Sequence, residues 1–295
     1  MNNKAGMKIT FIGGGNMATA LIAGLAGQLA AGADIHVVDP NAAQLARLAD
    51  DYGVTTAHTI GAQALASDVI VLAVKPQQMR DVAAALQPQL QQQSQLTGAL
   101  PLLLSIAAGI RGADLARWMK GYGAIVRSMP NMPALIGQGI TGMVAMEGVS
   151  EVQKAAADQI MLAVGATVWL DDEALIDPVT AVSGSGPAYV FYFIEAMQQA
   201  AQELGLSAEQ GKQLALATFT GAAQLAARSP DDVAVLRERV TSKGGTTYAA
   251  LTSMEQSGVK QAIVAAIKAA SARGRELGEQ MGRATDATDG QPTGN

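Results

Sequence analysis

The decisive stretch is Ile9-Thr10-Phe11-Ile12-Gly13-Gly14-Gly15-Asn16-Met17-Ala18. A short apolar run ends at the first glycine, and a helical pattern begins after the third. The spacing fits G-x-G-x-x-A, in which Gly13 makes the tight turn, Gly15 lets a pyrophosphate approach and Ala18 allows helix–strand packing. The stretch predicts a strand, a phosphate-binding turn and a helix. The alternative is a glycine-rich turn without a ligand.

Strands and helices alternate along the first part of the chain, from Lys8 to about Leu170. The expected strands are residues 9–12, 35–38, 69–74, 102–106 and 124–128, and the expected helices are residues 17–29, 42–50, 77–90 and 112–119. This alternation is typical of βαβ units and a mostly parallel sheet. Two more strands, at 139–146 and 166–169, flank a helix near 151–164 and are expected to close the sheet edge.

The strand pattern disappears after about Asp171. Helices are expected at residues 177–204, 207–227, 231–240, 247–256 and 259–282. The fold class is therefore α/β, a Rossmann-like doubly wound sheet followed by an all-α domain. The expected domains are 1–170, which binds a dinucleotide, and 171–283, which is helical. Residues 284–295 are nearly devoid of apolar side chains and are expected to be disordered.

Several helices of the second half are apolar on more than one side, notably at 187–201 and 214–225. Large exposed apolar patches on a soluble protein mark interaction sites. Burial against a second copy of the chain is the simplest expectation. The alternative is that these helices pack against the first domain.

Composition excludes several classes of function. The chain has 295 residues, a net charge of −5 and no basic stripe, which disfavours nucleic-acid binding. No segment offers the roughly 20 apolar residues of a membrane helix, so we expect a cytoplasmic protein. The absence of cysteine rules out thiolate metal sites and thiol catalysis. The two histidines, His36 and His58, do not lie in catalytic-looking surroundings, and no metal site is expected.

Asp39 ends the second expected strand, where an acidic side chain can bind a ribose diol. This favours NAD over NADP, because the carboxylate repels a 2′-phosphate. Asn41 and Arg47 follow closely, however, and either could turn towards such a phosphate. Asp39 could also simply cap the next helix, so the choice of cofactor stays open.

Other strand ends carry small or stiff residues. Ala73-Val74-Lys75-Pro76 ends a strand at the position that faces the ligand crevice of an open α/β sheet. Residues 105–109 end the next strand with small side chains, as if a flat ring lay against the backbone. Residues 127–133 form a stiff loop with two prolines, and 182–189 interrupt a helical stretch. Each of these segments could also be an ordinary turn or packing contact.

Near the end of the chain, Thr241-Ser242-Lys243-Gly244-Gly245-Thr246-Thr247 precedes a helical pattern. Glycines that free the backbone, hydroxyls beside them and a helix start favour the binding of a small anion such as a carboxylate. With the pyrophosphate turn at the other end, the sequence predicts a protein that brings two ligands together.

With these motifs in their order, the chain resembles pyrroline-5-carboxylate reductase over about residues 7–282. The resemblance rests on residues 12–18, 73–76, 105–109, 129–133, 183–189 and 240–247. It implies a helical domain that dimerises, with a pentamer of dimers as a larger assembly. It also implies reduction of L-1-pyrroline-5-carboxylate to L-proline by NADPH, with NADH as the alternative cofactor.

The resemblance also implies roles for individual residues. The residues implied to bind the cofactor are Ile12, Gly13, Gly14, Gly15, Asn16, Met17, Asp39, Ala73, Val74, Lys75, Pro76 and Ala107. The residues implied to bind the substrate are Glu173, Ser242, Gly245, Thr246 and Thr247, and Thr247 is the catalytic candidate, its hydroxyl bonding the ring nitrogen. Arg239 stands where many relatives carry an amide, and Ile60 stands where some carry an asparagine that touches the nucleotide.

Two other functions fit the sequence less well. A β-hydroxyacid dehydrogenase needs a lysine soon after residues 183–187, but the next lysine is Lys212. A non-catalytic nucleotide sensor would have no use for the second anion site.

Overall fold

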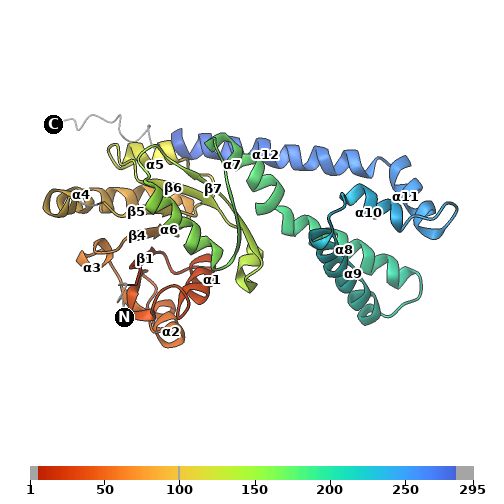
Figure 1. Cartoon of the computed structure of the whole chain (residues 1–295), viewed down its shortest axis with the longest axis horizontal. Helices are drawn as coiled ribbons and strands as arrows, with labels where there is room; N and C mark the ends of the chain where they lie inside the picture. Colours follow the sequence, from red (N-terminus) through yellow and green to blue (C-terminus); the bar gives the residue numbers. More distant parts are fainter. Residues whose placement is uncertain (1–5, 99, 284–295) are drawn as a thin grey trace, which may run out of the picture. The chain divides into compact units, whose positions relative to one another are not determined.

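The computed structural model of the chain describes residues 6–98 and 100–283 (Figure 1). The chain forms two compact units. The first runs to Gly184 and includes the residues from Ala270 onwards, and the second is Ser185–Ala269. The tail at 284–295, which we expect to be disordered, lies outside the described residues.

The first unit is built on one sheet with the order β3-β2-β1-β4-β5-β6-β7-β8 in the part of the chain that the structure describes. The strands are β1 (Ile9–Ile12), β2 (Ile35–Val38), β3 (Thr55–Ala57), β4 (Val69–Leu72), β5 (Leu102–Ser105), β6 (Ile125–Met129), β7 (Gly139–Ala145) and β8 (Gly165–Trp169). Neighbouring strands are parallel except β6 and β7, which are antiparallel. The order reverses direction between β1 and β4, as in doubly wound dinucleotide-binding sheets.

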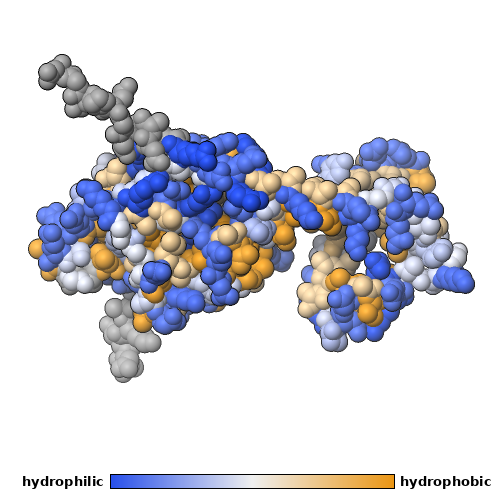
Figure 2. Space-filling model, turned by 90° about the horizontal axis from the view of Figure 1, so that it is seen from above, coloured by the Kyte–Doolittle hydropathy of each residue, from blue (hydrophilic) through white to orange (hydrophobic). Residues whose placement is uncertain are grey.

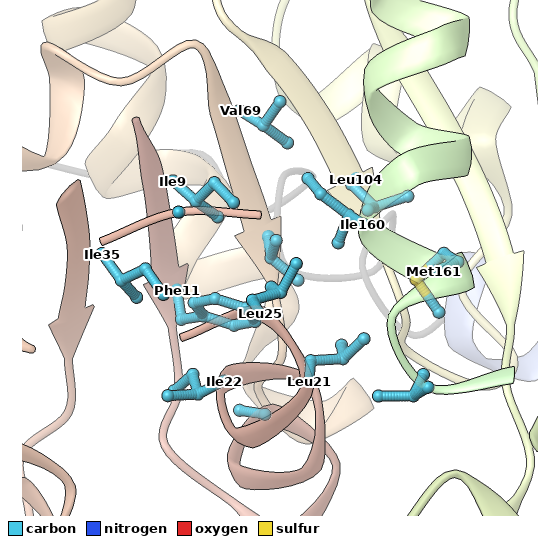
Figure 3. Packing of buried hydrophobic residues seen from close by; sticks show 14 of the residues in the cluster. Ile9, Phe11, Leu21, Ile22, Leu25, Ile35, Val69, Leu104, Ile160 and Met161 are labelled. Carbon is cyan, nitrogen blue, oxygen red and sulfur yellow. The ribbon is translucent and has the colours of Figure 1, made fainter. Parts of the chain in front are cut away.

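Helices cover both faces of this sheet. They are α1 (Asn16–Leu25), α2 (Ala42–Tyr52), α3 (Ala62–Leu65), α4 (Met79–Thr97), α5 (Gly112–Trp118), α6 (Glu151–Leu162) and α7 (Ile176–Val179). One core cluster joins the sheet to α1, α2 and α6, and a second joins it to α4 and α5. Figure 3 shows the first cluster, with Phe11 of β1 beside Leu25 of α1. Both faces are buried, which is why β4 and most of β5 read as continuous apolar runs, and β1 and β2 are apolar except for Thr10 and His36.

Shorter turns connect these elements. They are the 3₁₀ turns η1 (Gly32–Asp34), η2 (Pro76–Gln78), η3 (Met132–Ile136) and η4 (Glu173–Leu175), and the π-helical turn η5 (Thr180–Gly184). The helix predicted over 177–204 is therefore divided into α7, η5 and a further helix, α8 (Gly186–Glu203). Gly184 and Gly186 lie at the break. Glycine lowers helix stability, so these two residues favour an interruption there.

The second unit consists of helices. These are α8, α9 (Ala208–Arg228), α10 (Val233–Arg239), α11 (Thr246–Gln256) and the first part of α12 (Val259–Arg283). Helices α8 and α9 pack against each other, and Gly211 allows the close approach of Ala201. Many large apolar side chains remain exposed here, including Phe191 and Tyr192, and Figure 2 shows apolar residues reaching the surface of the molecule.

The last part of α12 packs on the first unit through glycines spaced four residues apart. A Cβ added at Gly278 would lie 3.2 Å from Arg111 Nε, and one added at Gly282 would lie 2.8 Å from Asp114 Oδ2. Arg117 Nη2 donates to the Gly282 carbonyl oxygen at 3.2 Å. The sheet ends at Trp169, whereas the compact units divide at Gly184. The predicted boundary after residue 170 is a division by element type and stays a prediction.

Candidate functional site

The glycine-rich turn between β1 and α1 has the geometry of an anion site. Gly13 has a φ of +101°, and a Cβ there would lie 2.6 Å from the Ala73 carbonyl oxygen, so only glycine fits. Gly15 is the N-cap of α1 and makes no side-chain capping bond. A Cβ added at Gly15 would meet nothing within 4 Å. Open space therefore adjoins an uncapped helix N-terminus, which fits a pyrophosphate.

One row of register explains why distant turns lie side by side. Along β2, β1, β4, β5 and β6 the aligned residues are Val38, Ile12, Leu72, Ser105 and Arg127. The turns predicted to bind the cofactor follow directly after four of these residues, at the carboxyl edge of the parallel strands. Ser105 Oγ is a buried hydroxyl without a hydrogen-bond partner in the described part of the chain. This edge is where open α/β sheets bind ligands.

A cleft of about 780 Å³ lies at this edge. The predicted cofactor residues that line it are Ile12, Gly13, Gly15, Asp39, Ala73, Val74 and Lys75. Those that do not line it are Gly14, Asn16, Met17, Pro76 and Ala107. Ala107 is instead a core residue at 5% exposure, packed beneath this edge of the sheet. A larger hollow of about 930 Å³ includes Asp68 and Val69, at the amino end of β4, and we do not regard it as the cofactor site.

Sequence reasoning missed one wall of the cleft. The wall is formed by His58, Thr59 and Ile60, which follow β3, and by Gln78, Asp81, Val82, Ala85 and Gln89. Gln78, Val82, Ala85 and Gln89 recur at intervals of three or four residues on and before α4, and Asp81 adjoins Val82, so these residues border one face of the helix. That spacing is visible in the sequence, but nothing in it says that this face of α4 borders the crevice.

Asp39 holds the glycine-rich turn through its carboxylate. Its Oδ2 accepts a hydrogen bond from the Gly14 N–H at 2.7 Å, and its Oδ1 accepts one from the Asn41 N–H at 2.8 Å. Asn41 also lines the cleft, and its side-chain oxygen caps α2 by accepting from the Gln44 N–H. Arg47, the other candidate for a 2′-phosphate, does not line the cleft. Among the described residues around it, Lys75 is the only lysine or arginine.

The two histidines differ in position. His36 is buried in β2, its Nδ1 lies 2.9 Å from Thr55 Oγ1, and burial lowers its pKa. His58 lines the cleft, although nothing in the structure gives it a role in proton transfer.

Glu173 lies in the first unit and is engaged in an ion pair. Its Oε1 accepts from Arg127 Nη1 at 2.8 Å and from the Gly112 N–H at 2.6 Å. Arg127 is only 4% exposed, and its Nη2 lies 4.0 Å from Asp177 Oδ1. The predicted substrate residue is therefore held by a buried guanidinium.

The other predicted substrate residues gather at the start of α11 in the second unit. Gly245 is the N-cap and makes no side-chain capping bond, and its N–H donates to the Ser242 carbonyl oxygen at 3.0 Å. A Cβ at Gly245 would lie 3.1 Å from that oxygen, so the turn favours glycine. The hydroxyls of Ser242, Thr246 and Thr247 have no hydrogen-bond partner among the described residues. This end of α11 is open to an anion.

Arg239 is paired within the second unit. Its Nη1 lies 2.5 Å from Asp231 Oδ2. This ion pair gives Arg239 a structural partner within the second unit.

The two remaining motifs pack against each other. Asn131 Nδ2 donates to the Ser183 carbonyl oxygen at 3.2 Å, and Asn131 Oδ1 accepts from the Ile140 N–H at 2.9 Å. A Cβ at Gly184 would lie 2.7 Å from Met129 Cε. Residues 129–133 and 183–184 therefore fix the π-helical turn against the sheet.

The described residues contain no cluster of three or more potential metal ligands. Over the same residues, no helix combines the length and the apolar character that a membrane crossing requires. The expected cytoplasmic location stays a prediction.

Comparison with known proteins bears on the whole chain. The family model described as pyrroline-5-carboxylate reductase dimerisation matches residues 173–277, and the one described as NADP oxidoreductase coenzyme F420-dependent matches residues 8–97. The pyrroline-5-carboxylate reductase of Pseudomonas aeruginosa is 46% identical over 94% of this chain and 98% of its own length. That of Haemophilus influenzae is 40% identical over 91% of this chain and 97% of its own length.

Solved structures agree with these relatives. The structure of a pyrroline-5-carboxylate reductase from Coxiella burnetii has a TM-score of 0.85 and 38% identity, covering 92% of this chain and 98% of that one. The Plasmodium falciparum pyrroline carboxylate reductase with NADP bound has a TM-score of 0.79 and 30% identity, covering 94% and 99%. The sequence motifs, the fold and these likenesses agree, and the chain belongs to the pyrroline-5-carboxylate reductase family.

Proposed function

We propose that this protein reduces L-1-pyrroline-5-carboxylate to L-proline with NAD(P)H. The observation that carries the proposal is the cleft beside Gly15, which adjoins the uncapped start of α1 at the carboxyl edge of the sheet. It occurs in a chain that is 46% identical to a pyrroline-5-carboxylate reductase over 94% of its length. Family membership and a cleft fit for a dinucleotide point to the same reaction.

The residues present fit a nicotinamide dinucleotide. The N–H groups at the start of α1 would hold the pyrophosphate. Val74 and Lys75, which also line the cleft, would border the rest of the cofactor. When bound, NAD(P)H supplies a hydride. The protein contributes the position and charge of its own groups.

The substrate carries a carboxylate and a ring C=N bond whose nitrogen protonates readily. In the reduction, the ring carbon of that bond gains a hydride while its C=N π bond is lost. The nitrogen keeps its proton as an amine and takes a second proton from water. No strong acid from the protein is needed, because the nitrogen is protonated before the hydride arrives.

The carboxylate is bound, in this proposal, by the N–H groups of Gly245, Thr246 and Thr247 together with the Ser242 hydroxyl. The Thr247 hydroxyl oxygen accepts a hydrogen bond from the ring nitrogen. Orientation of this kind contributes roughly 7–11 kcal/mol towards the barrier. The chemistry requires this helix end and the cofactor cleft to serve one substrate molecule, from one chain or from two copies.

The dimerisation domain supports self-association. We propose that the exposed apolar residues of α8 and α9 form the contact between copies, and that the protein elutes no smaller than a dimer. Light scattering coupled to size-exclusion chromatography measures the assembly and also distinguishes a dimer from a pentamer of dimers. A monomer at micromolar concentration would contradict the proposal.

The reaction itself is tested by the oxidation of NADH and NADPH by purified protein. Pyrroline-5-carboxylate should produce turnover, whereas 2-hydroxy acids with the oxidised cofactors, and reactions without substrate, should not. Turnover with a 2-hydroxy acid alone would favour a dehydrogenase, and turnover with neither would favour a nucleotide sensor.

A further inference from the structure

Arg127 is a buried charge at the edge of the sheet where the cofactor cleft lies. It occupies the same row of register as Leu72, whose next residue lines the cleft. The two are separated by two strand spacings, about 10 Å. A guanidinium is costly to bury unless it is paired. The groups that pair with the Arg127 guanidinium therefore indicate a function for this edge of the sheet.

The partners are two carboxylates. Arg127 Nη1 lies 2.8 Å from Glu173 Oε1, and Nη2 lies 4.0 Å from Asp177 Oδ1. One guanidinium thus faces two formal negative charges, and one negative charge is left in excess. The excess favours a cation as a third member of this cluster.

The bonding of Glu173 leaves one oxygen available for that cation. Oε1 accepts from both Arg127 and the Gly112 N–H, whereas Oε2 has no partner among the described residues. The Glu173 side chain is partly exposed, so solvent or a ligand can reach it. Gly112 is needed for this arrangement, because a Cβ there would lie 2.7 Å from Met146 Sδ.

We propose that Arg127 is a positioning residue that fixes Glu173 through Oε1, so that Oε2 faces the positively charged ring of the protonated substrate. The inference rests on the function proposed above. The negative charge stabilises the protonated C=N bond, which is the form that accepts a hydride. Arg127 touches neither substrate nor cofactor in this role and acts through Glu173.

The experiment compares steady-state kinetics of the full-length wild type, Arg127→Met, Glu173→Gln and the double variant. Arg127→Met should raise the KM for pyrroline-5-carboxylate roughly 10- to 100-fold, the value of one charge-assisted hydrogen bond. The KM for the nicotinamide cofactor should change less than about twofold. Glu173→Gln should likewise raise the KM for pyrroline-5-carboxylate and leave the cofactor KM nearly unchanged. The KM for pyrroline-5-carboxylate of the double variant should not exceed that of Glu173→Gln alone.

Arg127→Lys and Arg117→Met complete the design. Lysine keeps the charge with a different donor geometry, so Arg127→Lys should give an intermediate KM, and it replaces Arg127→Met if that variant fails to fold. Arg117 pairs with Asp114 at 2.9 Å on the same short helix, and Arg117→Met should leave the KM for pyrroline-5-carboxylate unchanged.

Three results would overturn the positioning role. They are an unchanged KM for pyrroline-5-carboxylate in Arg127→Lys or Arg127→Met, an equal rise in the cofactor KM, or multiplied losses in the double variant. A wild type that does not turn over pyrroline-5-carboxylate would instead contradict the proposed function itself. The two failures are therefore distinguishable.

Discussion

The two units differ in how much of their apolar surface they bury. The first unit buries nearly all of the large apolar residues in the core, from Ile9 to Ile176. In the described part of the second unit, only Ile194 and Ala215 are buried apolar side chains, while Phe191 is 53% and Tyr192 72% exposed. The first unit thus buries its apolar side chains within one chain, whereas much of the apolar surface of the described second unit stays exposed.

In the function proposed above, the two units bind their ligands through the same local feature. Each presents a glycine N-cap without a side-chain capping bond, Gly15 on α1 and Gly245 on α11. Gly15 follows closely on a strand of the buried sheet, whereas the turn before α11 lies among helices whose side chains are largely exposed. Substitutions at the glycine-rich turn of the first unit should therefore affect cofactor binding, and those in the second unit should affect turnover or assembly.

The largest effect is expected at Thr247. Thr247→Ala removes the hydroxyl oxygen that accepts a hydrogen bond from the ring nitrogen, so kcat should fall roughly 100-fold, the scale found when a single hydrogen-bonding group at a reacting centre is removed. Cofactor binding, followed by NAD(P)H fluorescence, should be nearly unchanged. Thr252→Ala, the same substitution further along α11, is the control and should keep full turnover. Equal activity of the two variants would remove Thr247 from the mechanism.

Charge on the exposed face of α8 is expected to dissociate the protein. Phe191→Asp should weaken association roughly 30-fold or more, the scale of an interface hot spot, and activity should fall with it. Light scattering over a range of protein concentrations measures the change. Val152, which is 81% exposed on α6 of the first unit, provides the control Val152→Asp. If both variants remain assembled, α8 is not the contact.

Gly15 and Gly13 separate function from fold in the first unit. Gly15→Ala adds a methyl group into open space, so Tm should hold while the KM for the cofactor rises roughly 10-fold. Gly13→Ala forces a side chain at a φ of +101° and against the Ala73 carbonyl, which should cost about 1–3 kcal/mol of stability. Thermal unfolding and cofactor titration of both variants test this. A Gly15→Ala variant that binds cofactor normally would place the pyrophosphate elsewhere.

Asp39 should disfavour a cofactor that carries a 2′-phosphate. Its carboxylate and that of Asp81 line a cleft in which Lys75 is the only described lysine or arginine, so a 2′-phosphate should be repelled there. Asp39→Ser should therefore lower the ratio of kcat/KM for NADH to that for NADPH several-fold relative to the wild type. Because the ratio is internal to each protein, loosening of the turn does not imitate the effect. An unchanged or higher ratio in Asp39→Ser would contradict this role of Asp39.

The smallest effect concerns pH. Burial lowers the pKa of His36 from 6.5, so the folded protein binds this proton less readily than the unfolded chain. The stability contributed by neutral His36 is complete above pH 6.5 and is lost as pH falls through the lowered pKa of the folded state. Denaturant unfolding of the wild type and His36→Gln between neutral and mildly acidic pH should show a shallower decline for the variant. Parallel declines would show that other groups dominate.

Much of the first unit follows from the sequence because its signals are local. The strands at Ile9–Ile12 and Ile35–Val38 agree with the predicted bounds, since short, mostly apolar runs end there at a glycine and at Asp39-Pro40. β3 was missed because its residues are polar and it is short and at the edge of the sheet. The break between α7 and α8 was seen as a motif but predicted within one helix.

What the sequence could not supply is pairing across long separations. Arg127 and Glu173 are 46 residues apart, and neither residue has a local pattern that indicates the other. The face of α4 that borders the cleft and the glycines of α12 that approach α5 are visible as spacings, but their partners are set by topology. The opposite holds for Thr246 and Thr247, because their local motif is clear in the sequence whereas the motif does not identify the ligand.

The proposed reaction requires the start of α11 and the cleft beside Gly15 to act on one substrate molecule. A crystal structure with an oxidised nicotinamide cofactor and L-proline tests it most directly. The proline carboxylate should lie on the N–H groups of Gly245–Thr247, with the reacting ring carbon of proline roughly 3–3.5 Å from C4 of the nicotinamide. Proline bound away from α11, or out of reach of the nicotinamide in every pair of subunits, would contradict it.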